Sequence, residues 1–257
     1  MLEIRNFAPA KFIPQNLAVH PQKATFPLNV LGRDFAVGDI HGCFSALQAA
    51  LDTVNFSPSV DRLFSVGDLV DRGSESHLVL EWLDQPWFFA ICGNHDFMTW
   101  RTALGNPYSK VDHQMHGGSW LSSLNAGAQQ AIGKRLAALP LIIEIDTPSG
   151  LVGVVHADFP YDDWASLSTE IHSEADTESF LWSVERYQRQ YNSPIRNLRA
   201  LVHGHITIPE MKVLGNVYYI DTGGWSTGHF TLLDLHSLQS FRGPGETFIP
   251  FQSRRYR

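Results

Sequence analysis

The sequence predicts an α/β (α+β) protein in which helices flank a central β-sandwich of mixed sheets. From residue 33 to residue 95, short apolar strands alternate with segments of helical periodicity. The middle of the chain is helical in pattern, and the part after residue 139 is rich in strands. The 257 residues, of which 44% are hydrophobic and 18% charged, are enough to bury a sizeable core in one domain.

Residues 1–32 are expected to form an extended N-terminal arm. They contain four prolines and no sustained periodicity, although one short strand is compatible with them. The main domain is expected over residues 33–245, and residues 246–257 form a C-terminal tail that contains three arginines. A solvated chain end explains this basic tail better than a nucleic-acid site does.

The first part of the main domain predicts three strands whose ends converge. The strands are 35–37, 62–66 and 87–91. They are followed by Asp39, Asp68 and Asn94, which lie 29 and 26 residues apart, about the length of a βαβ unit. Because parallel strands end at one edge of a sheet, these three polar side chains are expected to lie close together.

The other segments predict helices around this sheet and a second group of strands. Helical spacing of apolar residues marks 44–54, 78–83, 96–138 and 176–191. Glycines at 105 and 117–118 break the longest of these. The further strands are 141–145 and 151–155, which form a hairpin, then 200–202, a pair around the Gly215-Asn216 turn, and 230–233.

Charge, cysteines and hydropathy exclude several classes of protein. The net charge of −7 argues against binding nucleic acid through its phosphates. Cys43 and Cys92 form no Cys-x-x-Cys pair, and Cys92 is expected to be a buried thiol. No segment has the roughly 18–20 apolar residues that a membrane helix needs, and the N-terminus lacks the pattern of a signal peptide. We therefore expect a cytoplasmic monomer without nucleic-acid or membrane partners.

Side chains that bind metals follow the predicted strands. They stand in Gly38-Asp39-Ile40-His41-Gly42, Gly67-Asp68-Leu69-Val70-Asp71-Arg72-Gly73 and Gly93-Asn94-His95-Asp96, and at His156, His203 and His205. Mixed carboxylate and imidazole ligands suit Mn, Fe, Zn or Co. The residues are more numerous than one ion needs, and a shared aspartate can bridge two ions roughly 4 Å apart.

Each block alone also has a simpler structural interpretation. A Gly-Asp pair is often a turn, His41 could be a hydrogen-bonded loop residue, and Asn94 could cap a helix. The combination favours a metal site, because the blocks follow apolar strands and their glycines allow tight backbone paths around the polar residues.

Together these blocks resemble the phosphoprotein phosphatase (PPP) family of the calcineurin-like metallophosphoesterases, and most of all its bacterial and phage lambda-type serine/threonine phosphatases. Further points of similarity are His156-Ala157-Asp158-Phe159-Pro160, Leu181-Trp182-Ser183 and Tyr219-Ile220-Asp221-Thr222-Gly223. The resemblance covers residues 34–235. It implies the calcineurin-like metallophosphoesterase fold, with residues 33–245 as the catalytic domain.

The resemblance also implies two divalent metal ions, with Mn²⁺ as the first choice and Fe, Zn, Co or Ni as the others. The first ion would be bound by Asp39, His41 and Asp68, and the second by Asp68, Asn94, His156 and His205. Asp68 would thus bridge the two ions. His203, one strand position away, would either support these ligands from behind or have a structural role.

The reaction implied by the resemblance is hydrolysis of phosphoserine and phosphothreonine in proteins, with phosphotyrosine as a further substrate. A metal-bridging hydroxide would attack phosphorus directly, so no Ser or Cys nucleophile is needed. His95, oriented by Asp71, would protonate the leaving group. Arg72 and Asn94 would bind the phosphoryl oxygens, and Arg186 is expected to act as a second arginine there.

Two departures from the family pattern matter. Val184 stands where lambda-type phosphatases commonly have an arginine, so that either Arg186 or Arg189 would have to replace it. Asp96 stands where the protein phosphatases more often have glutamate. The form with aspartate also occurs in the symmetrical diadenosine tetraphosphatase branch.

Two alternative functions follow from these departures. The first is hydrolysis of a dinucleotide such as diadenosine tetraphosphate. Only 49 residues separate His156 from His205, fewer than that branch has, and Asp71 is often absent there, so the protein phosphatase is favoured. The second is a catalytically impaired binding module. Val184 is its one argument, since every expected ligand position is filled.

Two other features carry weaker expectations. His113-x-x-His116 has the spacing of helical metal ligands, but Gly117-Gly118 follows and no nearby acid completes a site, so a polar loop is expected. Trp164 follows the expected ligand His156 and is equally consistent with a structural position and with the wall of a substrate groove.

Overall fold

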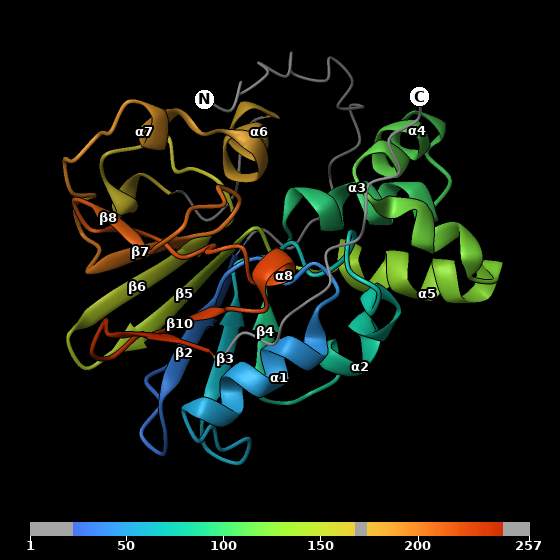
Figure 1. Ribbon diagram of the computed structural model, residues 1–257. Coiled ribbons are helices and arrows are strands. Elements are labelled where there is room, and N and C mark those ends of the chain that lie inside the picture. The colour runs from blue at the N-terminus through green and yellow to red at the C-terminus, as the bar shows by residue number, and fades with distance from the viewer. Residues whose placement is uncertain (1–22, 168–173, 244–257) are drawn as a thin grey trace.

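A computed structural model describes residues 23–167 and 174–243 of the chain. Two mixed β-sheets pack face to face, and the helices lie outside them (Figure 1). The fold class predicted from the sequence is therefore confirmed.

The five-stranded sheet contains the strands of the N-terminal pattern, in the order β11-β10-β2-β3-β4. These strands are β2 (Asp34–Val37), β3 (Arg62–Ser65), β4 (Phe88–Ala90), β10 (Thr231–Asp234) and β11 (Ser240–Arg242). Strands β2, β3 and β4 are parallel, whereas β10 runs antiparallel to β2. The three parallel strands consequently end at one edge, as predicted.

The six-stranded sheet has the order β1-β5-β6-β7-β9-β8. These strands are β1 (Lys23–Phe26), β5 (Ile142–Thr147), β6 (Gly150–Val155), β7 (Ala200–His203), β8 (Lys212–Leu214) and β9 (Val217–Tyr219). Strands β5 and β6 form the predicted hairpin, and β7 pairs in parallel with both β6 and β9. The ends of β6 and β7 therefore also lie together.

Strand β1 belongs to the predicted N-terminal arm. It pairs in parallel with β5, so this part of the arm is an edge strand of the sandwich. Lys23 at its start forms an ion pair with Glu144 of β5 at 2.9 Å. The rest of the arm, residues 1–22, and the predicted tail, residues 246–257, lie outside the described residues.

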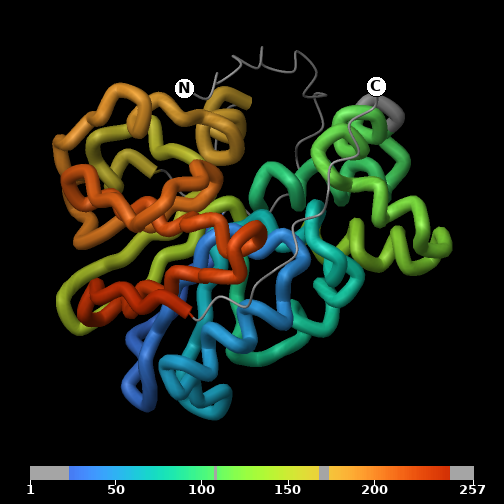
Figure 2. Tube along the Cα trace, in the orientation of Figure 1, coloured from blue at the N-terminus to red at the C-terminus, as the bar shows by residue number. Residues whose placement is uncertain are grey.

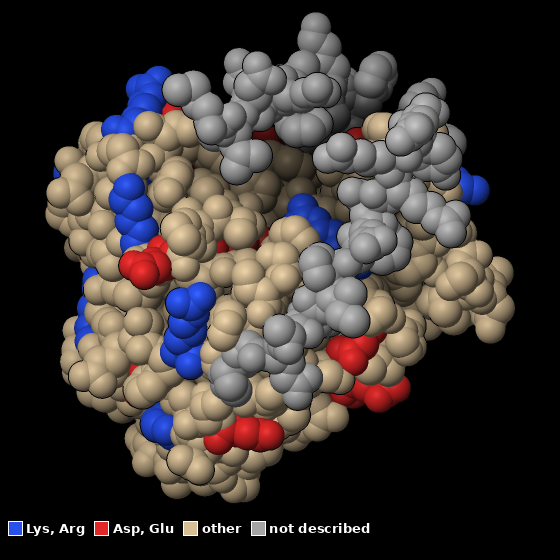
Figure 3. Space-filling view, viewed as in Figure 1, with Lys and Arg blue, Asp and Glu red and all other residues tan. Residues whose placement is uncertain are grey.

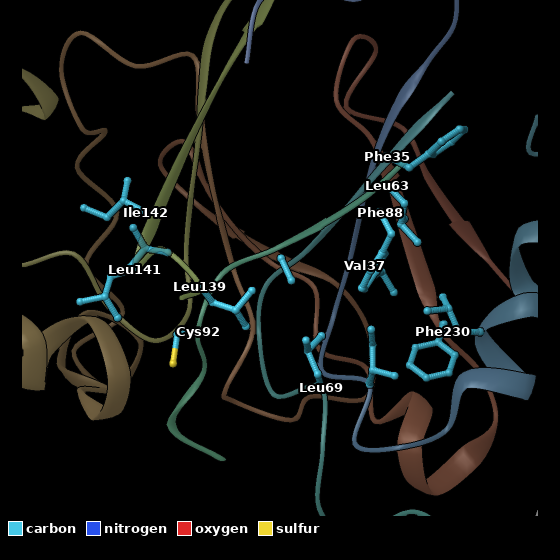
Figure 4. Packing of buried hydrophobic residues seen from close by; sticks show 14 of the residues in the cluster. Phe35, Val37, Leu63, Leu69, Phe88, Cys92, Leu139, Leu141, Ile142 and Phe230 are labelled. Carbon is cyan, nitrogen blue, oxygen red and sulfur yellow. The ribbon is translucent and has the colours of Figure 1, made fainter. Parts of the chain in front are cut away.

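Apolar side chains fill the space between the layers. Between the two sheets lie side chains from both, among them Phe64, Val66, Ile143, Val154, Val202 and Leu233. Because strand side chains alternate between faces, Phe35, Leu63 and Phe88 point the other way and pack side by side in a second cluster (Figure 4). Cys92 is fully buried in the same cluster, which confirms the expected buried thiol.

The helices connect the strands and cover the sandwich. They are α1 (Phe44–Thr53), α2 (Val79–Leu83), α3 (Asn94–Ala103), α4 (Pro107–Met115), α5 (Ala126–Ala137), α6 (Glu174–Trp182), α7 (Glu185–Gln188) and α8 (Gly224–Thr227), with short 3₁₀ turns η1 (Ser76–Leu78), η2 (Gly118–Ser123) and η3 (Trp164–Ser166). The green segment with α3 to α5 and the orange segment with α6 and α7 lie on opposite sides of the molecule (Figure 2). None of the helices in the described ranges is long and apolar enough to cross a membrane.

The structure differs from the sequence-based expectations in three short segments. Strand β11 and helix α8 were not predicted, because elements of three or four residues are too short for periodicity to mark. The polar loop expected around His113 is wrong. This residue lies in α4 and is fully buried, so the segment is a helix that packs into the protein.

Candidate metal centre

Strained loops at the strand ends carry the predicted metal ligands. Nine non-glycine residues of the described chain have positive φ angles, and five of them lie in these loops: His41, Asp68, Asp71, Arg72 and His205. Such backbone strain concentrates at functional sites, where the surrounding structure holds it in place. The sequence blocks with flanking glycines therefore mark constrained loops and not ordinary turns.

Two glycines allow these loops to approach one another. A Cβ atom at Gly93 would collide with the carboxylate of Asp68, and one at Gly204 would collide with the carboxylate of Asp39. Both glycines are therefore needed for close approach, whatever their own backbone angles.

Asp68 lies between two clusters of side chains that can bind metals. Ligand atoms of Asp68, His41 and His95 lie within 4.8 Å of one another, and so do those of Asp68, His156 and His205. Oδ2 of Asp68 is 3.6 Å from Nε2 of His41, and Oδ1 is 3.5 Å from Nε2 of His156. One carboxylate is thus shared by two clusters, as a bridging ligand would be.

Asp39 and Asn94 complete the group. Oδ2 of Asp39 lies 3.9 Å from Nε2 of His41, and both carboxylate oxygens accept from the backbone N–H of His205. Oδ1 of Asn94 lies 2.9 Å from Nε2 of His156 and 3.2 Å from Nδ1 of His205. The structure therefore brings all six predicted ligands together.

Backbone carbonyl groups orient the three imidazole rings. Nδ1 of His41 lies 2.9 Å from the Val70 carbonyl oxygen, and Nδ1 of His156 lies 2.8 Å from that of Val66. His205 makes a corresponding hydrogen bond to the backbone of Trp182. Since a carbonyl oxygen only accepts, each ring donates there and turns the lone pair of its other nitrogen toward the carboxylates and Asn94. Converging lone pairs of this kind suit a cation.

Burial sets the protonation of these ligands. It lowers the pKa of His41 and of His156, and it lowers the pKa of His205 to about 3. Burial alone would raise the pKa of Asp68, but the surrounding histidines, His156 first among them, bring it below the usual value. The pKa of Asp39 is raised by burial and by the nearby Asp221 carboxylate. Neutral imidazoles around an ionised Asp68 are the form that binds metals.

Arg72 reaches into the first cluster. Its NH1 lies 2.8 Å from Nε2 of His41, and its NH2 lies 3.1 Å from Nε2 of His95. The guanidinium stacks over Trp225 of α8, at 4.6 Å from the ring centroid. Trp225 is a neighbour that the sequence did not suggest, because α8 was not predicted. The predicted phosphate-binding arginine thus points at the metal-binding side chains.

His95 stands at the start of α3 with its ring held on one side. Its Nδ1 donates to Oδ2 of Asp71 at 2.8 Å, as expected, and its backbone N–H donates to Oδ1 of Asp68 at 2.9 Å. Asp96 in the same turn accepts from the backbone N–H groups of Gly93 and Leu69 at 2.9 and 3.0 Å. The aspartate that replaces a glutamate therefore ties the start of α3 to the Asp68 loop.

Arg186 does not reach this site. Its guanidinium is buried on α7, where it lies 4.0 Å from Asp158, 3.4 Å from Asp162 and over the ring of Tyr191. Its backbone N–H also donates to Asp158 at 3.0 Å. The structure thus directs Arg186 inward, and Arg189 pairs with Glu185 on the surface, so neither of the two expected arginines takes the place of the one that Val184 replaces.

We expect Arg186→Met to lower stability and leave substrate binding unchanged. Breaking a buried ion pair leaves Asp158 uncompensated and costs about 3 kcal/mol, or a decrease in Tm of about 6–12 °C. Arg189→Met is the matched control, because Arg189 pairs on the surface with Glu185 and should change Tm little. An increase in KM for a phosphopeptide at unchanged Tm would instead show that Arg186 binds the substrate phosphate.

Trp164 and His203, which the sequence analysis also singled out, are buried residues. Trp164 is 4% exposed, packs on Phe159 and donates from Nε1 to Glu144 at 2.7 Å, so it is a core residue and not a groove wall. His203 is fully buried, with Nδ1 2.7 Å from the Val155 carbonyl oxygen. This contact is to the residue that directly precedes the predicted ligand His156.

Where the face in Figure 3 is formed by described residues, the Lys and Arg side chains that are visible stand apart from one another.

Comparison with known proteins agrees with this geometry. Residues 35–236 match the family described as calcineurin-like phosphoesterases. A serine/threonine-protein phosphatase 2 from Escherichia coli is 36% identical over 210 residues, and its namesake from Salmonella typhimurium is 34% identical; each match covers 78% of this chain and 92% of the relative. A symmetrical bis(5'-nucleosyl)-tetraphosphatase from Actinobacillus pleuropneumoniae is 42% identical over only 83 residues, or 32% of this chain and 31% of its own.

Solved structures support the same fold. A crystal structure described as a candidate diadenosine tetraphosphatase superposes with a TM-score of 0.64 at 24% identity, covering 89% of this chain and all of the other. At this identity the likeness shows the fold alone. The family match and the two phosphatase relatives together carry the assignment: this chain belongs to the calcineurin-like phosphoesterase family, in the branch of the bacterial phosphoprotein phosphatases.

Proposed function

We propose that this protein is a metal-dependent phosphomonoesterase that removes phosphate from phosphoserine and phosphothreonine in proteins, and also from phosphotyrosine. The observation that carries the proposal is the Asp68 carboxylate, which is shared by two clusters of converging ligand atoms. The substrate class is supported by relatives named serine/threonine-protein phosphatases, which this chain matches over most of their length.

The residues fit two divalent cations. Three lone pairs on imidazole rings, two carboxylates and one amide oxygen face a common space. When bound, two such ions supply a hydroxide nucleophile at neutral pH and positive charge for the phosphoryl oxygens. Mn²⁺ is the first ion to test, before Fe, Zn, Co and Ni, and the working form is proposed to be a cytoplasmic monomer.

Arg72 is proposed to bind the phosphoryl group, together with Asn94. A planar guanidinium presents two parallel N–H donors to two phosphoryl oxygens. The contact from Arg72 to Nε2 of His41 uses the lone pair that a metal ion would take. The guanidinium therefore leaves this nitrogen when the metal site is loaded, and the face of Trp225 is a surface along which it can shift.

His95 is proposed to act as an imidazolium, with an N–H group at each ring nitrogen, and to transfer the proton of Nε2 to the leaving oxygen. Its Nδ1 is held by Asp71, so Nε2 is the nitrogen that faces the substrate. Because NH2 of Arg72 lies 3.1 Å from this Nε2, a phosphoryl group bound by the arginine also lies beside the acid. Serine and threonine are poor leaving groups as alkoxides, which makes such an acid necessary.

Diadenosine tetraphosphate hydrolysis is the second candidate. Its support is the local match to symmetrical tetraphosphatases, which lies within less than a third of this chain. A catalytically impaired binding module has Val184 in its favour, but every expected ligand is present and inside the cluster.

A comparison of substrates tests the proposed function. With metal-stripped protein reconstituted with Mn²⁺, we expect hydrolysis of a phosphoserine peptide, slower hydrolysis of a phosphotyrosine peptide, and at least about tenfold lower kcat/KM for diadenosine tetraphosphate. The Asp68→Asn protein, purified in the same way, controls for contaminating phosphatases. Preferred turnover of the dinucleotide would instead support a function in nucleotide metabolism. If no substrate were turned over, the binding module would be favoured.

A further inference from the structure

A group of buried hydrogen-bond donors surrounds the carboxylate of Asp71, on the side away from His95. Oδ1 of Asp71 accepts from Nε2 of His113 at 2.8 Å and from Nε1 of Trp120 at 2.7 Å. Thr99 lies between them, with its hydroxyl 2.8 Å from Nε2 of His113 and 3.4 Å from Oδ1 of Asp71. Asp71, Thr99 and His113 are each fully buried.

We propose that His113 and Trp120 are positioning residues for the acid His95, because they hold the carboxylate of Asp71 in the orientation that His95 needs. With Oδ1 occupied by these two donors, Oδ2 is left for Nδ1 of His95 at 2.8 Å. A carboxylate held at both oxygens cannot rotate without breaking one of these hydrogen bonds. The inference rests on the proposed function, in which His95 protonates the leaving group.

The segment around residue 117 is built to bring these donors to Asp71. His113 lies near the end of α4 and Trp120 in η2, and the two are joined by the turn Gly117-Gly118. A Cβ atom at Gly118 would collide with the His113 ring, and Gly117, at φ 100°, accepts from the backbone N–H of Arg72. The turn therefore packs directly against the loop that contains Asp71.

The hydrogen-bond pattern assigns the tautomer of His113. Its Nε2 faces the Asp71 carboxylate, which only accepts, so this nitrogen carries the hydrogen. Its Nδ1 is buried and has no hydrogen-bond partner within residues 23–167 and 174–243, as suits the nitrogen without hydrogen. The ring is consequently a donor to Asp71.

Electrostatics support this role. Burial would raise the pKa of Asp71, but hydrogen bonds from His113 and then His95 lower it to about 2. The carboxylate thus remains charged at neutral pH, although it has no access to water. Both donors that achieve this belong to the proposed chain from His113 to Asp71 to His95.

The first test measures how the reaction depends on the leaving group. In Trp120→Phe and His113→Leu, we expect kcat for a phosphoserine peptide to fall about tenfold, and kcat for p-nitrophenyl phosphate to fall less than about threefold. The difference is expected because p-nitrophenolate leaves with little need of an acid. In a His95→Asn background, neither substitution should reduce kcat for the peptide further, because the three residues act as one unit. Equal losses on both substrates, or losses that add to that of His95→Asn, would overturn the proposal.

A matched control separates positioning from general destabilisation. Trp82→Phe removes a half-buried indole of α2, which stacks on Phe44 away from Asp71. It should lower Tm to a similar extent as Trp120→Phe but leave the ratio of the two kcat values unchanged. The same change of ratio in Trp82→Phe would contradict a specific role for Trp120.

A second measurement does not depend on activity. In NMR spectra of the Zn²⁺-loaded full chain, we expect an N–H signal from Nδ1 of His95 that shifts and exchanges faster in Trp120→Phe and in His113→Leu. An unchanged signal in both variants would refute the positioning role. If the wild type hydrolysed neither ester, the proposed function would fail, while the NMR result would still decide whether Trp120 and His113 hold the Asp71–His95 pair.

Discussion

Asp68→Asn is expected to reduce kcat for a phosphoserine peptide by about 10³-fold or more and to prevent the binding of two metal ions together. Its carboxylate lies 3.6 Å from His41 and 3.5 Å from His156, so among the described residues it is the one side chain that contributes to both clusters. An amide has one oxygen and no charge, so it cannot hold two cations side by side. The measurements are steady-state kinetics and metal content per chain after dialysis against Mn²⁺.

Folding of the Asp68→Asn protein should be intact, because the amide oxygen can still accept the backbone N–H of His95, now at 2.9 Å. The matched control is Asp61→Asn, which neutralises another buried carboxylate far from the clusters and weakens its ion pair with Arg33. This control should lose stability but bind two metal ions and remain active. Two tightly bound ions in Asp68→Asn would show that another residue provides the bridge.

His95→Asn is expected to produce a loss that depends strongly on the leaving group. For a phosphoserine peptide the loss in kcat should be about 10²–10³-fold, the usual contribution of a general acid. For p-nitrophenyl phosphate it should be about tenfold or less, because this leaving group needs little protonation. Parallel measurements of kcat with the two substrates provide the check.

Metal content distinguishes an acid from a ligand at this position. The ring of His95 lies within 4.8 Å of the ligand atoms of His41 and Asp68, so proximity alone is compatible with either role. As an acid, His95 can be replaced without loss of metal, and two ions should remain in His95→Asn. Loss of one ion, with equal kinetic losses on both substrates, would instead make His95 a ligand.

The convergence of the ligands could be predicted from the sequence because simple topology governs it. Asp39, Asp68 and Asn94 each follow a strand, and the ends of parallel strands share one edge of a sheet. No distance between side chains had to be known for that step. His156 and His205 were also seen to follow strands, but their place in the same ligand set came from the resemblance to the phosphoprotein phosphatases.

The surroundings of Asp71 could not be predicted in this way. His113 lies 42 residues further along the chain, and its contact with Asp71 depends on how α4 packs against α3. The acid next to His113 in the sequence is Asp112, which pairs with His116, whereas the partner of His113 in space is Asp71. The contact of Trp120 with Asp71 was equally unpredictable, because the sequence of an irregular segment does not show where a tryptophan N–H group points.

Arg186 shows a second limit of reasoning from the sequence. Its distance from Trp182 along the chain suggested a substitute for the arginine that Val184 replaces. The direction of its side chain was decided by Asp158, whose buried carboxylate accepts the Arg186 backbone N–H at 3.0 Å and lies 4.0 Å from its Nε. The position of an arginine in the sequence thus indicates that it binds a negatively charged group, but not which group it binds.

The division of the ligands between two sheets couples metal supply to the cohesion of the sandwich. Asp39 and Asp68 follow β2 and β3 of one sheet, whereas His156 and His205 follow β6 and β7 of the other. Bound ions would therefore link the two sheets, and the sheets could not separate without releasing the ions. By mass action, the Tm of the folded chain would rise with the concentration of free metal. Metal availability in a cell would then determine the lifetime of the protein as well as its catalytic activity.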